Sequence, residues 1–393
     1  NAFVLANSGD ITITGEKGSA STYADVVNNN TIGYIDSLPS GFGITSPVTS
    51  SSSNINIIAD TIKAGQVFGT GNFSASKIQS NGILTLAPKT VGKNLYIQNT
   101  TPTDTSAAWF NPNSMFGATG LFTPGFSKLI FGSATTGSVV LDNYTFDQDT
   151  QIKSSNTVTL GAIKIENDKS LEVITTGTSV TDSGVVEVAN LAIDASNADV
   201  VLDESNQIGA IAANVKSLNL QNTQALSIGS VKGINGVTST NNINIATLNG
   251  DLTIKNNIST ASTTTDAIVL NAGKNSSAGT KTGGNIVHES GTITTGINGR
   301  TTLFTGGIGE STGLSPLVSI GDFRYYSDEI STNYTKSLGN GIYAIYREQP
   351  IIKISPNSQN ITYGDSTSSI TYGSSGFVNG DDASTLAGTA SFI

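Results

Sequence analysis

Short runs of alternating apolar and polar residues recur along most of this chain of 393 residues. Most runs place apolar side chains at positions i and i+2, the period of a β-strand with one face in a core. Asn, Gly, Ser, Thr or Asp bounds nearly every run, which indicates short strands separated by turns. The clearest runs are 139–141, 158–160, 163–165, 171–173, 191–193, 200–202, 218–220, 226–228, 243–245, 252–254 and 268–270.

The spacing of these strands favours a parallel β-solenoid over an antiparallel sandwich. A sandwich built from hairpins needs two-residue turns such as Asn-Gly between neighbouring strands. Asn-Gly occurs at Asn235-Gly236 and Asn249-Gly250, but it does not separate most of the runs. A coil of about twenty residues with two or three strands fits better, because stacked coils pair each strand in parallel with its equivalents. We therefore expect an all-β solenoid, with the sandwich as the alternative.

Charge and composition exclude several classes of partner. The formal net charge is −10, and the only arginines are Arg300, Arg324 and Arg347, so no basic stripe exists to neutralise phosphates. We expect no binding to nucleic acid or to an anionic membrane surface. The absence of cysteine excludes disulfides and thiolate metal sites. No apolar run is long enough for a transmembrane helix, so no membrane insertion of this segment is predicted.

Two segments without strand periodicity, near residues 14–53 and 99–126, interrupt the pattern. We interpret both as excursions from coil corners, where insertions leave the ladder undisturbed. The second contains the single tryptophan, Trp109, followed by Phe110 and Phe116. Such rings either stack on sugars or pack the excursion against the solenoid, and packing is their commoner use. Trp109, Phe110 and Phe116 are the candidate ligand contacts.

The chain divides into three expected parts. Residues 1–305 form the solenoid, the tyrosine-rich segment 306–350 forms a cap or junction, and residues 351–393 form a partial, small β-rich unit. A cap is expected because the open end of a solenoid exposes unpaired strand edges. The strand pattern is already under way at Asn1, and the last unit reaches Ile393 without a closing turn. We therefore expect the sequence to be part of a longer protein.

An ordered series of short segments resembles the large exoproteins of the filamentous haemagglutinin type. The series comprises 84–91, 190–193, 208–213, 225–229, 250–254 and 293–296, followed by Gly299-Arg300. The segments 361–365 and 376–381 resemble the start of the YDG/MBG repeats that often follow in such adhesins. The resemblance implies a right-handed parallel β-helix and a location outside the bacterial cell or on its surface. It also implies export by an outer-membrane two-partner-secretion transporter. The N-terminal secretion domain of the family is not visible in this sequence.

The side chains that could carry chemistry are few. Asp142, Asp147 and Asp149 form the best acidic cluster, as a polysaccharide-processing enzyme would need, although turn aspartates are the commoner explanation. The single histidine, His288, lies next to Glu289 and has no third partner implied by spacing. No phosphate-binding loop, zinc signature or calcium repeat is present. We therefore predict no enzymatic activity, no metal and no cofactor.

The most consistent hypothesis is a secreted bacterial adhesin or extracellular fibre segment, with the solenoid as a rigid stalk. Its partners would be a glycan or protein of a host or neighbouring cell, or copies of itself. The alternatives are a self-assembling filament without a receptor and, less favoured, a β-helix enzyme that processes polysaccharides.

Overall fold

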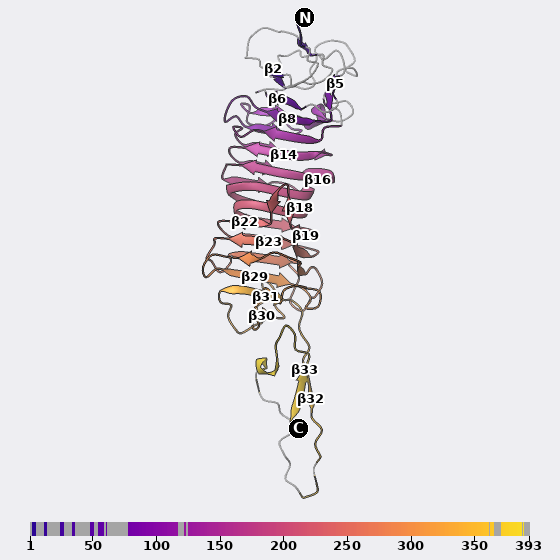
Figure 1. Cartoon of the computed structure of the whole chain (residues 1–393), viewed down its shortest axis with the longest axis vertical. Helices are drawn as coiled ribbons and strands as arrows, with labels where there is room; N and C mark the ends of the chain where they lie inside the picture. The colour runs from indigo at the N-terminus through magenta and orange to yellow at the C-terminus, as the bar shows by residue number, and fades with distance from the viewer. Residues whose placement is uncertain are drawn as a thin grey trace.

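The protein was analysed as a computed structural model of the whole chain. It describes residues 54–58, 60, 78–116, 122, 125–360, 362–364, 371–386 and 388, and the short strands before residue 54. For those early strands and for residues 78–80 it describes the backbone only. The chain is 48% strand and 2% helix, and it forms a parallel β-helix whose coils stack along the long axis of the molecule (Figure 1).

Each coil contributes a strand to up to three faces of the β-helix. The long strands β16 (Ile163–Thr175) and β18 (Val186–Asn222) pass around corners and join more than one face. Face one holds β2 (Thr12–Ile13), β4 (Tyr34–Ile35), β6 (Ile55–Ile58), β8 (Ile83–Ala87), β11 (Lys128–Gly132), β14 (Asp149–Ser154), β22 (Val237–Ser239), β25 (Ile258–Thr260) and β28 (Ile293–Thr294). Face two holds β10 (Ala108–Phe110), β9 (Leu95–Ile97), β12 (Val139–Leu141), β15 (Val158–Leu160), β17 (Ser179–Asp182), β23 (Ile243–Thr247), β26 (Ile268–Ala272), β29 (Arg300–Thr305) and β31 (Gly341–Tyr346). Face three holds β13 (Tyr144–Phe146), β19 (Leu226–Ile228), β24 (Leu252–Ile254) and β27 (Ile286–His288).

The strand register confirms the parallel solenoid and excludes the antiparallel sandwich. Val158 pairs with Val180, and Val180 pairs with Val200, so successive coils are 22 and 20 residues long. Every printed pairing within the three faces is parallel. The expected coil of about twenty residues is therefore present. Part of the excursion expected at 14–53 belongs to the ladder, since β4 pairs in parallel with β2 and β6. Most of the rest of that excursion lies outside the described residues.

The inward position of each strand carries an apolar side chain, and these side chains stack into one continuous core. Three-residue strands such as β9, β12 and β15 follow the pattern buried, half-buried, buried. The core runs without a break from Ile55 to Tyr346. A coil alone could not hide these side chains, so burial itself requires the coils to stack.

Buried polar side chains hold the corners. Asn206 and Asn222 are both fully buried. The Oδ1 atom of Asn206 accepts from Val186 N–H at 2.9 Å, and that of Asn222 accepts from Ile208 N–H at 2.7 Å. Each amide oxygen thus accepts from a backbone N–H of the preceding coil. Other corner asparagines, namely Asn156, Asn197 and Asn241, are exposed.

The β-helix ends one strand later than predicted. We expected its end at Thr305, but β31 pairs in parallel with β29 along its whole length, from Arg300↔Gly341 to Thr305↔Tyr346. Four successive residues of β31 are buried, so the alternation of buried and half-buried side chains is lost there. The excursion between β29 and β31 covers the outer face of β31. Within that excursion, β30 (Phe323–Arg324) pairs with β31 and covers part of its open edge, as a cap should.

A buried arginine ties the capping excursion to an earlier coil. The Arg347 guanidinium is fully buried and donates to the carbonyl oxygens of Ala272 and Gly284, at 2.7 and 2.8 Å. From the excursion, Asp328 accepts from Ala278 N–H at 2.7 Å, and Glu329 accepts from Asn275 N–H at 2.8 Å. The loop that follows β26 is therefore held by both ends of the cap.

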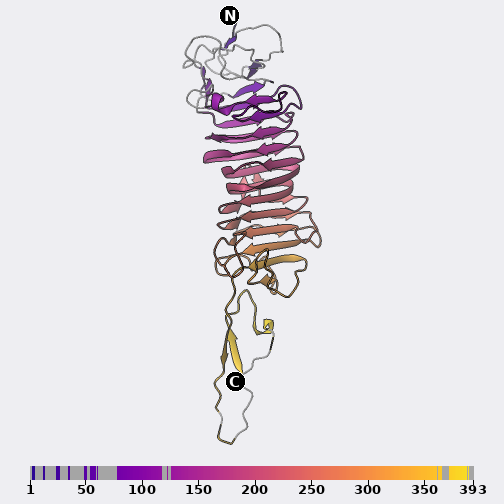
Figure 2. The same ribbon diagram turned by 180° about the vertical axis from the view of Figure 1, so that it is seen from behind.

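A small β-rich segment follows the β-helix and projects beyond its end (Figure 2). Its strands β32 (Lys353–Pro356) and β33 (Tyr372–Ser375) form an antiparallel hairpin. The segment touches the cap through Tyr325, whose hydroxyl donates to Asp381 Oδ2 at 3.0 Å. This arrangement agrees with the expected partial β-rich unit after the solenoid.

The remaining short elements decorate this framework. They are β1 (Ala2–Val4) with β3 (Ala24–Val26), β5 (Val48–Ser50) with β7 (Ile78–Ser80), the hairpin of β20 (Ser230–Val231) and β21 (Ile234–Asn235), the helix α1 (Pro112–Met115) and the 3₁₀ turn η2 (Ala383–Thr385).

We predict that Asn222→Ala destabilises the β-helix. The substitution leaves Ile208 N–H and the carbonyls of Ile208 and Gln224 without the bonds that Asn222 now makes at 2.7 to 3.0 Å. Unsatisfied buried groups cost about 1–3 kcal/mol, so the midpoint of urea unfolding should fall.

Asn244→Ala is the matched control, because the Asn244 side chain is exposed and, among the described residues, bonds only to Asn219, at 2.8 Å. Its effect should stay within about 0.5 kcal/mol. Equal midpoints for the two variants would contradict a structural role for the buried corner amide.

Candidate functional site

The excursion at 99–126 folds back toward the N-terminal end of the β-helix. Its strand β10 pairs in parallel with β9, on the edge opposite to β12. The short helix α1 follows, and Phe116 and Phe122 then form an isolated bridge. No strand of face three is described before β13, and residues of this excursion lie beside β13 instead. The excursion therefore creates a step in the surface of that face.

The aromatic side chains of the excursion mostly pack. Phe110 is fully buried, so it is removed from the candidate ligand contacts. Phe116 is half-buried, and its ring lies 5.6 Å from the Phe122 ring and 5.9 Å from the Tyr144 ring, measured between centroids. This cluster packs the excursion against the β-helix, which is the commoner use of aromatic side chains.

Trp109 is the one predicted contact that points outward from a strand. It is half-buried and pairs in register with Tyr96 of β9. Its indole Nε1–H donates to the carbonyl oxygen of Gln98 at 2.8 Å, which holds the ring in one orientation. Of the three predicted residues, the structure therefore buries Phe110 and leaves Trp109 and Phe116 half-buried, with Phe116 packed in the aromatic cluster.

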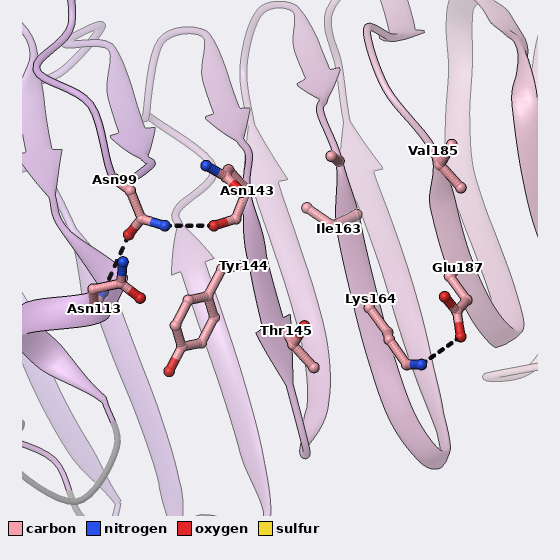
Figure 3. A pocket seen from close by; sticks show the side chains of 10 residues that line it. Asn99, Asn113, Asn143, Tyr144, Thr145, Ile163, Lys164, Val185 and Glu187 are labelled. Carbon is pink, nitrogen blue, oxygen red and sulfur yellow. Dashed lines mark hydrogen bonds and ion pairs between the residues drawn. The ribbon is translucent and has the colours of Figure 1, made fainter.

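An open groove of about 640 Å³ lies on face three, at the step made by the excursion (Figure 3). The excursion contributes Asn99 and Asn113 to one end of the groove. Three successive coils contribute its floor and its other end. The lining residues are Asn99, Asn113, Asn143, Tyr144, Thr145, Ala162, Ile163, Lys164, Val185 and Glu187.

Strand register places equivalent residues along the groove. Thr145 pairs with Lys164, and Lys164 pairs with Glu187, so one outward side chain from each coil stands in a row. Neighbouring strands lie about 4.8 Å apart, which sets the spacing of this row along the axis.

Asn143 occupies the corner that leads into the first of these strands. Its backbone is left-handed, with φ of 55°, a conformation that asparagine tolerates better than most residues. Its carbonyl oxygen accepts from the Asn99 side-chain amide at 2.6 Å, which joins the excursion to the coil. Figure 3 shows the Asn143 side chain beside Asn99 and Tyr144.

An ion pair crosses the floor of the groove. Lys164 Nζ lies 2.7 Å from Glu187 Oε1 and 3.8 Å from Glu166 Oε1. The hydrogen bond to Glu187 raises the pKa of Lys164 above its ordinary value. A second depression of about 430 Å³ adjoins the groove and shares Lys164 and Glu187 with it. The two depressions meet at this ion pair, and together they are called the trough below.

The acidic cluster predicted from sequence serves separate structural bonds. Asp142 Oδ1 accepts from Ala162 N–H at 2.9 Å, and Asp149 Oδ1 accepts from Ser170 N–H at 2.8 Å, each in the following coil. Asp147 is exposed and has no hydrogen bond or ion pair within the described residues. Within the same part of the chain, no group of three His, Asp or Glu side chains is placed to hold a metal ion.

His288 is also held by local backbone groups. Its Nδ1 lies 3.2 Å from the carbonyl oxygen of Gly313, and its Nε2 lies 3.0 Å from that of Gly291. Glu289 Oε1 lies 3.8 Å from Lys255 Nζ, so the carboxylate pairs with the lysine and not with the imidazole. His288 thus ends β27 with both ring nitrogens beside backbone carbonyl oxygens and no carboxylate at the ring.

Comparison with known proteins finds no matching family model, no similar curated protein and no similar solved structure. Among the described residues, no helix has the length and apolar character needed to cross a membrane. The resemblance to filamentous haemagglutinin-type exoproteins thus remains a prediction from sequence.

The groove was not predicted, and its residues explain why. Asn99, Asn143 and Glu187 belong to different coils and share no motif. Their proximity depends on strand register and on the folding back of the excursion. The sequence signals only the excursion itself. Its aromatic residues are the predicted ligand contacts, whereas Asn99 and Asn113 line the groove.

We predict that Asp149→Asn lowers stability in a pH-dependent way. Burial raises the pKa of Asp149, but the Lys232 ammonium at 2.7 Å and the Ser170 N–H outweigh burial and hold the pKa below its ordinary value. A depressed pKa gives stability that is present above the unfolded-state value of about 4 and lost as pH falls through the folded-state value. Asparagine keeps the oxygen that accepts from Ser170 N–H, and it replaces the oxygen that accepts from Lys232 with an uncharged NH₂ group.

The variant should lose about 1 kcal/mol at pH 7, measured by urea unfolding, and the difference should vanish near pH 2. Asp147→Asn is the control and should change stability little at either pH. An Asp149→Asn protein as stable as the parent at pH 7 would show that the ion pair with Lys232 contributes nothing.

Proposed function

We propose that this chain is a stalk segment of a secreted bacterial surface adhesin or extracellular fibre. The observation that carries the proposal is the continuous core and parallel ladder from β6 to β31. Because each coil contacts only its neighbours, such a ladder extends along one axis and resists bending. A rigid rod of this kind suits mechanical reach away from a cell surface better than it suits enclosure of a substrate.

Sequence resemblance supports the location and the route of export. The ordered segments from 84–91 to 293–296 resemble exoproteins that leave the cell through an outer-membrane two-partner-secretion transporter. The absence of cysteine is compatible with export, since the ladder needs no disulfide to hold it. In this proposal the protein has no enzymatic activity and no cofactor, and the acidic residues of its coils stabilise corners.

Attachment is proposed to be multivalent. Stalks displayed in many copies on one surface turn modest individual contacts into firm attachment through effective concentration. The partner is a glycan or protein on a host or neighbouring cell. Trp109 is the residue of the excursion most available for such a contact, because it points outward beside Tyr96.

Beads coated with the full chain should attach to cultured epithelial or bacterial cells more than beads coated with albumin. Trp109→Ala should reduce attachment several-fold if the ring is a contact, while circular dichroism and thermal midpoint stay near those of the parent. Phe122→Leu is the matched control, since Phe122 is fully buried within the aromatic cluster and should affect stability more than attachment.

Unchanged attachment by a folded Trp109→Ala protein would remove Trp109 as a contact. Attachment no greater than that of albumin-coated beads, on every cell type tested, would contradict the adhesin proposal itself.

A self-assembling filament is the second candidate, and the hairpin after the cap favours it. In that segment Ile351, Ile354 and Tyr372 are exposed, and both strands of the hairpin lie largely open to solvent. A two-stranded hairpin is marginally stable alone and gains from a further strand or surface. Copies of the chain could supply that surface.

If the filament proposal is correct, purified chain should form elongated assemblies in negative-stain electron microscopy, and Ile354→Asp should abolish them. The charge would disfavour burial of the hairpin face against another copy. Val91→Asp, at an exposed position distant in sequence, is the control. Single rods for the parent protein at all concentrations would contradict self-assembly and leave the adhesin proposal in place.

A further inference from the structure

We propose that the groove on face three binds a neutral, extended, β-linked polysaccharide whose chain runs parallel to the axis of the β-helix. This inference rests on the proposed attachment function and names the ligand class for it. It places polysaccharide binding at the residues around Asn143, Tyr144 and Thr145, a site separate from the proposed contact at Trp109.

Several polar groups in the groove lack a protein partner. Within the described residues, the Asn143 side-chain amide and the hydroxyl groups of Tyr144 and Thr145 make no hydrogen bond, and all three residues line the groove. An amide offers both donors and an acceptor, and each hydroxyl offers both roles. Sugar hydroxyl groups have the same dual character, so they can pair with every one of these groups.

The floor of the groove also offers an apolar surface held in place. Tyr144 is half-buried, and its ring centroid lies 4.8 Å from that of Phe146 and 5.9 Å from that of Phe116. Ile163, from the next coil, lies beside it (Figure 3) but is itself buried, so the Tyr144 ring supplies the accessible apolar surface. A ring fixed by its neighbours loses little conformational entropy on binding, and its face suits the C–H face of a pyranose.

The repeat of the β-helix matches the repeat of such a polymer. Thr145, Lys164 and Glu187 present one outward side chain per coil in register. Coils follow one another at about 4.8 Å, the spacing of hydrogen-bonded strands. An extended β-linked pyranose chain advances by a similar distance per ring, so successive rings can meet equivalent positions on successive coils.

The charges of the trough select against polyanions. In the groove, Lys164 is paired with Glu187 at 2.7 Å, so its charge is already compensated. The adjoining depression adds Glu166 and Asp168 and no further cation. Sulfated or carboxylated polysaccharides would meet net negative charge there, whereas neutral polysaccharides incur no such repulsion.

The direct test is isothermal titration calorimetry of the full chain with cellohexaose and with chitohexaose, and with a heparin hexasaccharide for comparison. At least one neutral hexasaccharide should bind, and the heparin hexasaccharide should not. Asn143→Gly removes the amide and retains the left-handed backbone, and Thr145→Val removes the hydroxyl and retains the branched shape.

Each variant should weaken binding about fivefold, the equivalent of one lost hydrogen bond of about 1 kcal/mol. Thr253→Val is the matched control, because Thr253 of β24 is half-buried on the same face but does not line the groove. It should bind like the parent. Thermal midpoints of all variants verify that they fold.

Three results would overturn the proposal: no binding of either neutral hexasaccharide, equal binding by the parent and both groove variants, or tighter binding of the heparin hexasaccharide. Bead attachment separates these failures from failure of the proposed function. Parent-level attachment by the double variant Asn143→Gly/Thr145→Val would overturn the groove as the attachment site and leave the adhesin proposal standing. Absence of attachment by the parent would count against the adhesin proposal itself, whatever the calorimetry shows.

Discussion

Each coil of this protein can bury its apolar side chains only by stacking on the next coil. A three-residue strand such as β12 hides two side chains, and its backbone pairs in parallel with β9 on one side and β15 on the other. Hydrogen bonding and apolar burial thus depend on the same contact between coils. The protein consequently behaves as a one-dimensional array, in which every coil needs a neighbour and the two ends need separate protection.

The corners meet a second requirement, because a turn inside a close-packed stack leaves backbone groups that water cannot reach. Buried amide and hydroxyl side chains supply the missing partners. Asn222 bonds to both the N–H and the carbonyl of Ile208, and Thr175 donates to the carbonyl of Asn156 at 2.7 Å. Charged side chains do similar work at the surface, where Asp142 and Asp149 accept from backbone N–H groups of the next coil. These uses explain an abundance of Asn, Ser and Thr without any catalytic role.

The groove proposed for recognition lies where the array is interrupted. The excursion at 99–126 occupies the place beside β13 that a preceding strand would take, and it fastens there through the contacts of Phe116 with Tyr144 and Phe146. The step exposes one end of face three and brings Asn99 against Asn143. A regular stack would have presented a flat face at this point. The cap at the other end is also an interruption, but there Arg347 and the carboxylates of Asp328 and Glu329 close the loops onto the ladder.

The sequence by itself predicted short strands in coils of about twenty residues and favoured a parallel stack over a sandwich, and the pairing of the strands then decided between the two. The i, i+2 alternation at 158–160 or 252–254 and the coil length follow from local patterns that any register must respect, and the structure confirms both. Only the tertiary structure decided which residues meet across coils. Phe110 and Trp109 are adjacent in sequence, yet one is fully buried and the other points outward, because neighbours on a strand face opposite ways. The end of the β-helix at Tyr346 and the row of Thr145, Lys164 and Glu187 likewise depend on strand pairing over long separations, and a single sequence carries no local signal of that pairing.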